Sequence, residues 1–314
     1  MKLVNAKTRI LLKLFLPQRK KANPKYAIPE SDKNLSGKTI VLTGGTDGIG
    51  RVAVEMLYKM NANIVLLARN PQKVQKQIEE LKLPKRQNRI DFEDCDLVSM
   101  SSVKDCANRI LKKYDNIDVL VNCAGINSTD KAVSKDGFEL NWAINYLAPY
   151  LLTNLLLERL KESASARIVN ITTNTDFLEK INFDEIEKQS DFDTDDNYSA
   201  SKLSLNMFSI DLAERLKNSG VSVNYLYPGY IKSNLLRHLK GGAKLMQFMM
   251  NIMASPTEVG ADRIVRLAIS SEYKDVTGVY VAEDQITPPH SEAQIESKRE
   301  KLEQITVKAL NQWL

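Results

Sequence analysis

The sequence has few of the residues from which metal sites and charge-relay sites are built. Only two histidines, His238 and His290, occur among 314 residues, together with three cysteines, Cys95, Cys106 and Cys123. A multi-histidine site would lack ligands, and no cysteines show the paired spacing that holds zinc or an iron–sulfur cluster, so we expect no metal. Three cysteines also cannot form a disulfide framework, which favours a reducing compartment such as the cytoplasm.

The body of the chain, taken as residues 26–314, is not basic, although the net charge of the whole chain is +5. The first 25 residues carry eight Lys or Arg and no acid, which leaves 36 bases and 39 acids in the other 289 residues. The body therefore has no overall positive field for a phosphate backbone, and we expect no nucleic-acid partner.

The basic N-terminal arm has the pattern of an amphipathic helix over residues 3–16. Apolar side chains share one side of that helix, Lys2, Arg9 and Lys13 lie roughly opposite, and no apolar run exceeds three residues. The arm is therefore too polar to cross a bilayer, but peripheral contact with an anionic membrane surface is one interpretation. A helix packed on the domain, a frayed tail and an organelle-targeting segment are the alternatives.

The remaining chain alternates short β-branched runs with helix-length segments, which predicts one α/β domain. Prolines at 17, 24 and 29 indicate a linker, so residues 1–35 are assigned to the arm and linker and residues 36–314 to the domain. Strands are predicted at 39–43, 63–68, 89–93, 118–122, 167–172, 221–226 and 279–282. This alternation is typical of a Rossmann-type, doubly wound parallel sheet with helices on both faces. Ser255-Pro256-Thr257-Glu258 predicts a capped helix start, and a C-terminal helical extension follows the last strand.

A glycine-rich turn, TGGTDGIG at 43–50, follows the first predicted strand and opens a helix. Gly44 permits the tight turn, Gly48 lets the backbone approach a pyrophosphate, and Gly50 allows the helix to pack on the strand. Free N–H groups and the helix dipole attract phosphates at such a turn. The turn predicts a dinucleotide site that also includes Thr46, Asp47 and Ile49.

The end of the second predicted strand indicates which dinucleotide is bound. IVLLARN at 64–70 has no acid for a ribose 2′-hydroxyl, whereas Arg69 and the nearby Arg51 offer positive charge for a 2′-phosphate. NADP(H) is therefore favoured over NAD(H), with Arg69 as a solvated surface residue the alternative. Asp96 and Leu97 are placed to meet the adenine edge, although Asp96 is equally suited to cap the next helix.

Four motifs together resemble the short-chain dehydrogenase/reductase family. They are TGGTDGIG at 43–50, NCAG at 122–125, YSASK at 198–202 and the PG pair at 228–229. The segment at 136–157, the wide spacing before Tyr198 and the C-terminal extension are most similar to retinol-dehydrogenase-like members and their polyprenol-directed relatives. The resemblance implies further cofactor contacts from Asn122, Ala124, Gly125, Tyr198, Lys202, Pro228, Gly229, Ile231 and Ser233.

Tyr198 and Lys202 carry the predicted chemistry. On a helix they share a face, so the ammonium lies near the phenol and favours its ionised form, which suits the phenol to proton transfer. The family assigns that proton transfer to Tyr198. It further implies that Lys202 holds the nicotinamide ribose and that Asn145 keeps a water that relays protons.

Thr173 stands where the family usually carries a serine that hydrogen-bonds the substrate oxygen. Threonine retains the hydroxyl but adds a methyl group and stiffens χ1, so it can replace serine if the hydroxyl points inward. Thr172 and Thr175 are fallback candidates. The alternative is that these threonines only favour a strand end, and that turnover is weakened or lost.

The substrate is expected to be a lipophilic small molecule. A basic turn at 237–244 precedes methionines spaced three and four apart within 246–253, a flexible apolar stripe whose alternative role is ordinary core packing. The first hypothesis is an NADP(H)-dependent oxidoreductase that interconverts a lipophilic alcohol and its aldehyde or ketone. The second is a dinucleotide-binding scaffold or sensor with little or no turnover. A homo-oligomer is neither required nor excluded by the sequence.

Overall fold

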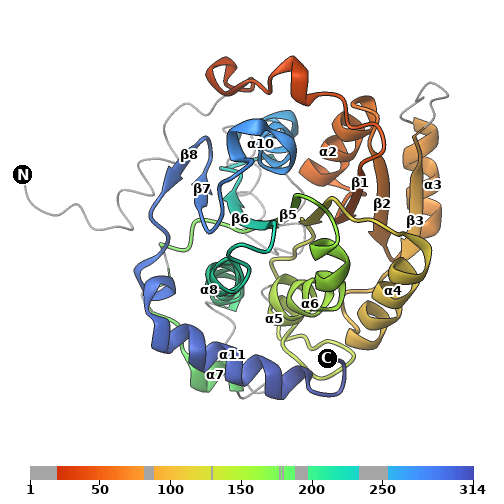
Figure 1. Ribbon diagram of the computed structural model, residues 1–314. Helices are drawn as coiled ribbons and strands as arrows, with labels where there is room; N and C mark the ends of the chain where they lie inside the picture. Colours follow the sequence, from red (N-terminus) through yellow and green to blue (C-terminus); the bar gives the residue numbers. More distant parts are fainter. Residues whose placement is uncertain are drawn as a thin grey trace, which may run out of the picture.

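An eight-stranded sheet in the order β3-β2-β1-β4-β5-β6-β7-β8 forms the centre of the computed structural model (Figure 1). The structure describes residues 20–80, 88–128, 130–176, 178, 180–187, 197–232 and 254–314. Its strands are β1 (Thr39–Thr43), β2 (Asn63–Ala68), β3 (Ile90–Asp94), β4 (Val119–Asn122), β5 (Ala166–Ile171), β6 (Val221–Tyr227), β7 (Tyr280–Ala282) and β8 (Gln285–Thr287). All neighbours pair in parallel except β7 and β8. The predicted doubly wound α/β fold is confirmed.

The predicted strands agree with the observed ones to within about one residue, but β8 was not predicted. β7 and β8 form an antiparallel hairpin in which Ala282 faces Gln285. Its turn contains Glu283 at φ 57°, a left-handed conformation that glycine or asparagine adopts more readily. The turn residues are Glu283 and Asp284 rather than the Asn-Gly pair that favours a two-residue hairpin. The sequence therefore did not predict this hairpin.

Helices cover both faces of the sheet (Figure 1). One face packs against α2 (Gly48–Lys59), α3 (Pro71–Glu80) and α10 (Thr257–Ile269). The other carries α4 (Met100–Lys113), α5 (Leu140–Trp142), the π-helical turn η3 (Ala143–Leu147), α6 (Ala148–Lys161) and α8 (Asn197–Arg215). Both faces of the central strands are therefore buried, which explains their nearly continuous apolar sequences.

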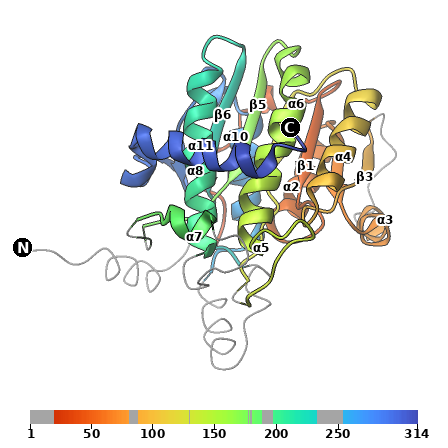
Figure 2. The same ribbon diagram turned by 90° about the horizontal axis from the view of Figure 1, so that it is seen from below.

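The C-terminal extension adds an outer layer. Helix α11 (Glu296–Leu310) lies across α8 and α6 (Figure 2), preceded by the short turn η5 (Ser291–Gln294). The hydroxyls of Tyr146 and Thr306 lie 2.7 Å apart, the Tyr150 hydroxyl donates to Glu303 Oε1 at 2.6 Å, and Trp313 Nε1 donates to Ser101 Oγ at 3.0 Å. The short helix α7 (Phe183–Glu187) lies nearby.

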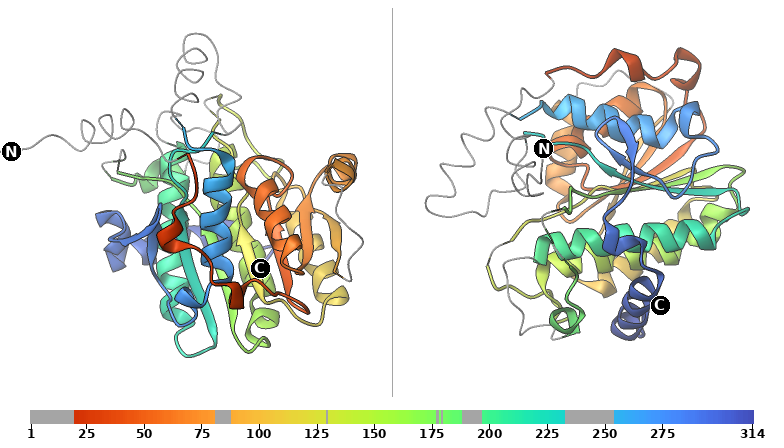
Figure 3. Two further views of the ribbon diagram at one scale, coloured as in Figure 1. Left: turned by 90° about the horizontal axis from the view of Figure 1, so that it is seen from above. Right: turned by 90° about the vertical axis from the view of Figure 1, so that its left-hand side faces the viewer.

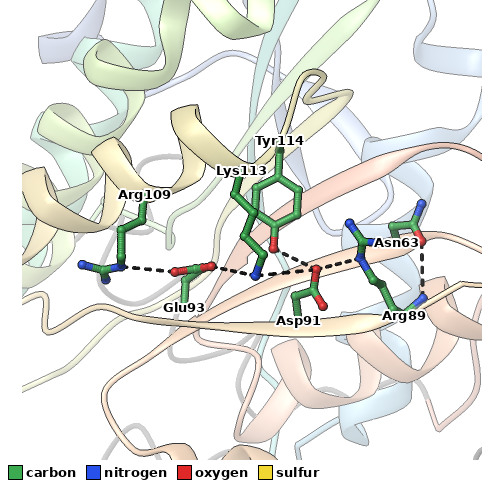
Figure 4. Close-up of polar contacts among 7 residues, drawn as sticks. All are labelled: Asn63, Arg89, Asp91, Glu93, Arg109, Lys113 and Tyr114. Atoms are coloured by element: carbon green, nitrogen blue, oxygen red, sulfur yellow. Dashed lines mark hydrogen bonds and ion pairs between the residues drawn. The ribbon is translucent and has the colours of Figure 1, made fainter.

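Charged side chains hold the edge strand β3 against α4 (Figure 4). Glu93 accepts from Arg109 Nε at 3.2 Å and from Lys113 Nζ at 3.0 Å, while Asp91 accepts from the Tyr114 hydroxyl at 2.8 Å. Arg89 Nε also donates to Asp91 at 2.7 Å. Charges along an edge strand oppose pairing with another chain, and here they also fix the start of the loop that carries Asp96.

Helix α10 begins one residue later than the capping pattern predicted. Pro256 is the N-cap, with no side-chain cap hydrogen bond, and Thr257 is the first helical residue. Ser255, the predicted cap, is instead part of an isolated parallel bridge: its N–H donates to Tyr230 O at 2.9 Å and its carbonyl accepts from Lys232 N at 2.8 Å. This pairing keeps Ser255 extended ahead of the helix.

Residues 24–35, interpreted from the sequence as linker, pack along α10 and α2 (Figure 3). They include the short turns η1 (Pro24–Tyr26) and η2 (Glu30–Asp32), and bury Ile28 and Leu35 in the core. Asp32 Oδ2 accepts from Ser271 N at 2.7 Å, at the start of the turn η4 (Ser271–Tyr273). Proline spacing alone could not reveal these contacts, because the partners lie near the other end of the chain.

The amphipathic segment at 3–16 lies outside the described residues, so its interpretation as a membrane-contacting helix stays a prediction. Within the part of the chain that the structure describes, no helix combines the length and the apolar character needed to span a bilayer.

The packing of Ile28 predicts a measurable contribution to stability. Ile28 is 6% exposed, so Ile28→Ala should lower the free energy of unfolding by about 2–4 kcal/mol through lost burial and a residual cavity. Urea denaturation followed by circular dichroism measures the change. Lys21→Ala, at an exposed position just before this segment, should change it by less than about 0.5 kcal/mol. Equal effects of the two substitutions would mean that the segment is a linker.

Candidate active site

The glycine-rich turn and the loop after β4 touch at the carboxyl edge of the sheet. Gly44 has φ +74°, and a Cβ there would lie 2.6 Å from the backbone nitrogen of Ala124. The Thr43 hydroxyl oxygen accepts from the N–H groups of Cys123 at 3.1 Å and Ala124 at 3.2 Å. β1 is the strand from which the order runs outward in both directions, the position at which doubly wound sheets bind ligands.

Gly48 leaves open space at the start of α2. It has φ +50°, and a Cβ built there meets no heavy atom within 4 Å. Asp47 is the N-cap of α2, with its Oδ1 accepting from Gly48 N at 2.8 Å. A helix N-terminus with this open approach fits a dinucleotide pyrophosphate. Thr46 and Ile49 are partly exposed beside it.

Close packing between α2 and the strands depends on Gly45 as well as on Gly50, and Gly45 was not singled out in the sequence. A Cβ on Gly45 would lie 2.4 Å from Leu66 Cδ1 and 2.8 Å from Val54 Cγ2, between β2 and α2. A Cβ on Gly50 would instead lie 2.4 Å from the carbonyl oxygen of Gly44. Because Gly50 has no side chain, the first turn of α2 can lie against the backbone directly after β1. The adjacent glycines at 44 and 45 were the available signal, because a turn needs only one of them for its positive φ.

Arg69 and Arg51 differ in their interactions with the rest of the protein. Arg69 is exposed directly after β2 and makes no hydrogen bond or ion pair with the other described residues. Arg51 Nη2 lies 3.1 Å from Glu80 Oε2 at the end of α3. The structure thus leaves Arg69 available to a ligand, whereas Arg51 would have to break or share its ion pair with Glu80 in order to bind one.

Asp96 is held by a lysine rather than by the next helix. Its Oδ2 accepts from Lys135 Nζ at 2.8 Å, and its Oδ1 accepts from Val98 N at 3.3 Å. Ser99 is the N-cap of α4, so the alternative that Asp96 caps this helix is wrong. Leu97 is partly buried against the α4 side of the core.

Asn122 points into the protein interior. Its Nδ2 donates to Thr153 Oγ1 at 3.0 Å and to Asn170 Oδ1 at 2.8 Å, and the Asn170 Nδ2 donates to Ser209 Oγ at 2.8 Å. This buried chain joins β4 and β5 to α6 and α8. The side-chain amide of Asn122 therefore ties the sheet to its helices, beneath the loop that carries Ala124 and Gly125.

Asn145 lies in the π-helical turn η3 and is fully buried. Its Oδ1 accepts from Ile126 N at 2.9 Å, and its Nδ2 donates to Ile126 O at 2.9 Å and to Ser201 Oγ at 3.0 Å. Single π turns within helices are frequent at functional sites. Here the amide joins the loop after β4 to α8, one residue before Lys202.

Lys202 reaches the same loop from α8. Its Nζ donates to Ile171 O at 2.8 Å, and a Cβ on Gly125 would lie 3.3 Å from both this Nζ and Asn145 Oδ1. Burial lowers the pKa of Lys202 to about 8, because the charged ammonium has lost its hydration. Gly125 thus keeps open the space that Lys202 and Asn145 border.

Tyr198 contacts Thr173 across the end of β5. Burial raises the pKa of Tyr198 to about 12, and a hydrogen bond with the Thr173 side chain opposes the rise. The expectation that the Lys202 ammonium favours the phenolate is not met in this structure, where that ammonium is directed to the Ile171 carbonyl. Of the threonine candidates, Thr172 donates its hydroxyl to Lys202 O at 3.2 Å and Thr175 is buried, which leaves Thr173 beside the phenol.

The Pro228-Gly229 corner follows β6 at the same edge. Pro228 is buried, Gly229 has φ +87°, and Ile231 pairs with Ser255. Ser233, the basic turn at 237–244 and the methionine stripe within 246–253 lie outside the described residues. Their predicted roles in cofactor and substrate binding stay predictions.

The doubly wound sheet, the glycine turn and the Tyr198–Lys202 helix define a Rossmann-type oxidoreductase. The chain belongs to the short chain dehydrogenase family, whose family model matches residues 38–243. The resemblance seen in the sequence is thereby confirmed.

Three known proteins are examples of what the chain is similar to. The chain is 32% identical over 279 residues to retinol dehydrogenase 13 of Mus musculus, covering 87% of this chain and 83% of the relative. It is 29% identical over 258 residues to human polyprenol dehydrogenase, covering 80% and 78%. A solved structure described as an NAD(P)-dependent gluconate 5-dehydrogenase from Beutenbergia cavernae, with bound NADP, shares the fold at TM-score 0.65 and 22% identity, covering 81% of this chain and 97% of its own.

The buried ammonium of Lys202 predicts that the protein is more stable without it. A pKa that falls from 10.5 to about 8 on folding destabilises the fold by about 3 kcal/mol below pH 8, a penalty that disappears as pH rises to 10.5. Lys202→Met should therefore raise the free energy of unfolding at pH 7 by about 2 kcal/mol, since the lost bond to Ile171 O offsets about 1 kcal/mol.

Urea unfolding at pH 7 and pH 9.5 tests this sign. The advantage of Lys202→Met should shrink at the higher pH, whereas Lys217→Met, at an exposed position, should leave stability within about 0.5 kcal/mol at both. A less stable Lys202→Met protein at pH 7, or a difference that does not vary with pH, would contradict the depressed pKa.

Proposed function

We propose that the protein is an NADP(H)-dependent oxidoreductase that interconverts a lipophilic alcohol and its aldehyde or ketone. The observation that carries the proposal is the junction of Thr173, Tyr198 and Lys202 beside Gly125, at the edge where the glycine turn lies. A proton donor, a hydroxyl and a cation thus border the space next to the candidate dinucleotide site. These are the groups that carbonyl reduction requires.

A bound nicotinamide would supply or accept the hydride, and the side chains of this chain would handle the proton. In reduction, the Tyr198 hydroxyl donates its proton to the substrate oxygen while the Thr173 hydroxyl hydrogen-bonds the same oxygen. In oxidation, Tyr198 accepts the proton. Lys202 would bind the ribose and Asn145 would hold a water near the Ile126 carbonyl that it already contacts at 2.9 Å.

The protonation states favour reduction in the cofactor-free site. With a pKa raised to about 12, Tyr198 holds its proton at neutral pH and can act as an acid. Lys202, with a pKa of about 8, is mostly protonated there. For oxidation the phenol would need a lower pKa, which the ammonium would provide if a ribose drew it away from Ile171 O.

Arg69 supports NADP(H) as the cofactor. Its guanidinium is exposed at the end of β2, where a 2′-phosphate of a dinucleotide on the glycine turn would lie. A solved structure of similar fold contains bound NADP, which is compatible with this choice, whereas another was solved with NADH. The discrimination therefore rests on Arg69 rather than on the relatives.

Two named relatives support a lipophilic substrate. They are called retinol dehydrogenase and polyprenol dehydrogenase, and both alcohols are long and apolar. We extend this class of long apolar alcohols to the present chain without choosing a member of it.

Peripheral membrane contact through the basic N-terminal arm would suit such a substrate. Deletion of residues 1–25, followed by sedimentation with anionic vesicles, would test that contact. Homo-oligomerisation is left to direct measurement.

Tyr198→Phe is expected to remove activity while leaving the cofactor bound. Loss of the proton donor should lower kcat for NADPH-dependent reduction by about 10²- to 10⁴-fold, whereas the affinity for NADPH should change little. A panel of retinoid, polyprenal, steroid and simple aldehydes would be assayed by NADPH consumption. Tyr230→Phe, a partly exposed tyrosine near the same corner, is the control.

The panel also separates the two hypotheses. Activity in the wild type that persists in Tyr198→Phe would eliminate Tyr198 as proton donor. Tight NADPH binding with no turnover of any substrate would instead favour the scaffold or sensor, the alternative to which the Thr173 replacement points.

Arg69→Ala is expected to change cofactor preference. Losing a charge-assisted contact to the 2′-phosphate should weaken NADPH binding by roughly 10- to 100-fold and leave NADH within about twofold. Arg51→Ala should lose less, because Arg51 is already paired with Glu80, and Lys76→Ala on the exposed side of α3 should change neither. Calorimetric titration with both cofactors measures this. Equal losses for NADPH and NADH would refute the phosphate role of Arg69.

A further inference from the structure

Two buried arginines on α10 share one carboxylate in the β7–β8 turn. Arg263 donates from Nε to Asp284 Oδ1 at 3.0 Å and from Nη2 to Asp284 Oδ2 at 2.9 Å. Arg266 Nη2 donates to the same Oδ1 at 3.2 Å. Arg263 is 2% exposed and Arg266 1% exposed. No sequence motif pointed to a role for these three residues.

Only Arg263 reaches the Pro228-Gly229 corner. Its Nη1 donates to Pro228 O at 2.6 Å, and a Cβ on Gly229 would lie 2.7 Å from the same nitrogen. Glu283 flanks the corner on its other side: its N–H donates to Tyr227 O at 2.7 Å, and its Cγ would lie 3.1 Å from that Cβ. The guanidinium thus occupies the space that any side chain at 229 would need.

Arg266 faces elsewhere. Its guanidinium carbon lies 4.9 Å from the centroid of the Tyr26 ring, in the N-terminal segment. The two arginines are therefore alike in helix, in burial and in binding Asp284. They differ in their other contacts, because Arg263 also donates to Pro228 O and, at 3.4 Å, to Glu283 Oε2, whereas Arg266 lies over the Tyr26 ring.

We propose that Arg263 is a positioning residue for the Pro228-Gly229 corner and, through it, for the nicotinamide half of the cofactor. The proposal rests on the proposed function, and on the family resemblance, which implies that this corner borders the nicotinamide of the bound cofactor. Asp284 holds the guanidinium through two hydrogen bonds, so the remaining Nη1 has little freedom and fixes the direction of the Pro228 carbonyl. The direction of that carbonyl sets where the chain leaves β6, because Gly229, at φ +87°, can adopt many other conformations.

Arg263→Met and Arg266→Met form a matched pair for the test. Each removes one guanidinium and leaves Asp284 paired with the other. Arg263 makes two hydrogen bonds to Asp284 and Arg266 makes one, so global stability is allowed to differ between the variants and the comparison is made at the corner itself. Arg263→Lys adds a variant that keeps the positive charge for Asp284 but lacks the fork that spans Asp284 and Pro228 O together. It keeps the test decisive if Arg263→Met does not fold.

Hydrogen exchange in the cofactor-free protein gives a readout that does not depend on activity. The Lys232 amide donates to Ser255 O at 2.8 Å just beyond the corner, so its protection reports whether the corner holds its place. Exchange at 229–232 should accelerate at least tenfold in Arg263→Met and in Arg263→Lys, and stay within threefold of the wild type in Arg266→Met. Equal acceleration in Arg263→Met and Arg266→Met, or none in either Arg263 variant, overturns the proposal.

Binding of two probes then localises the effect within the cofactor. Calorimetry should show NADPH binding at least tenfold weaker in Arg263→Met, with 2′,5′-ADP, which lacks the nicotinamide half, within twofold of the wild type. Parallel losses for both probes would mean a general disturbance and would overturn the positioning role. If the wild type binds neither probe, the proposed function fails, while the exchange result still decides whether Arg263 holds the corner.

Discussion

The close approach of two loops at the edge of the sheet is the constraint on which the candidate site depends. β1 pairs with β4 so that Thr43 lies opposite Asn122, and the Thr43 hydroxyl then accepts from two amides of the following loop. Gly44 can lie against Ala124 only because it has no Cβ. This contact places the N-terminus of α2 and Gly125 on one side of the sheet edge, and every group of the candidate site is arranged around them.

Of the two ionisable groups, Lys202 is held there at the expense of stability at neutral pH, whereas the Tyr198 phenol is neutral at that pH in both the folded and the unfolded chain. Burial shifts the pKa of Tyr198 upward and that of Lys202 downward, which in both cases disfavours the charged form. Neutral polar contacts hold the surroundings in place: Asn145 binds both polar groups of Ile126, and Asn122 joins Thr153 to Asn170. Amides thus fix the segments around the ionisable residues, and the burial of a hydrogen-bonded amide is less unfavourable than that of another charge.

Local patterns predicted the parts of the fold that depend on local chemistry. The alternation of apolar strands with amphipathic helices predicted the parallel sheet. The glycines directly after the first strand predicted the glycine-rich turn. The β8 hairpin, the packing of residues 24–35 and the partners of Asp96 could not be read in this way. Each depends on residues distant in sequence: Arg263 for the turn at 283–284, Ser271 for Asp32, and Lys135 for Asp96. Similarly, the i,i+4 spacing of Tyr198 and Lys202 was visible, but not that Ile171 O takes the ammonium.

The arginine pair on α10 illustrates why such distant contacts persist. A buried ion pair contributes little net stability, since desolvation opposes the attraction and an apolar replacement of similar volume is often equally stable. What an apolar side chain cannot supply is direction. Arg263 joins the β7–β8 turn to the end of β6, and Arg266 contacts both that turn, through Asp284, and the Tyr26 ring. One helix thus fixes the relative positions of three segments that have no sequence proximity, and the Pro228-Gly229 corner is the one that faces the candidate active site.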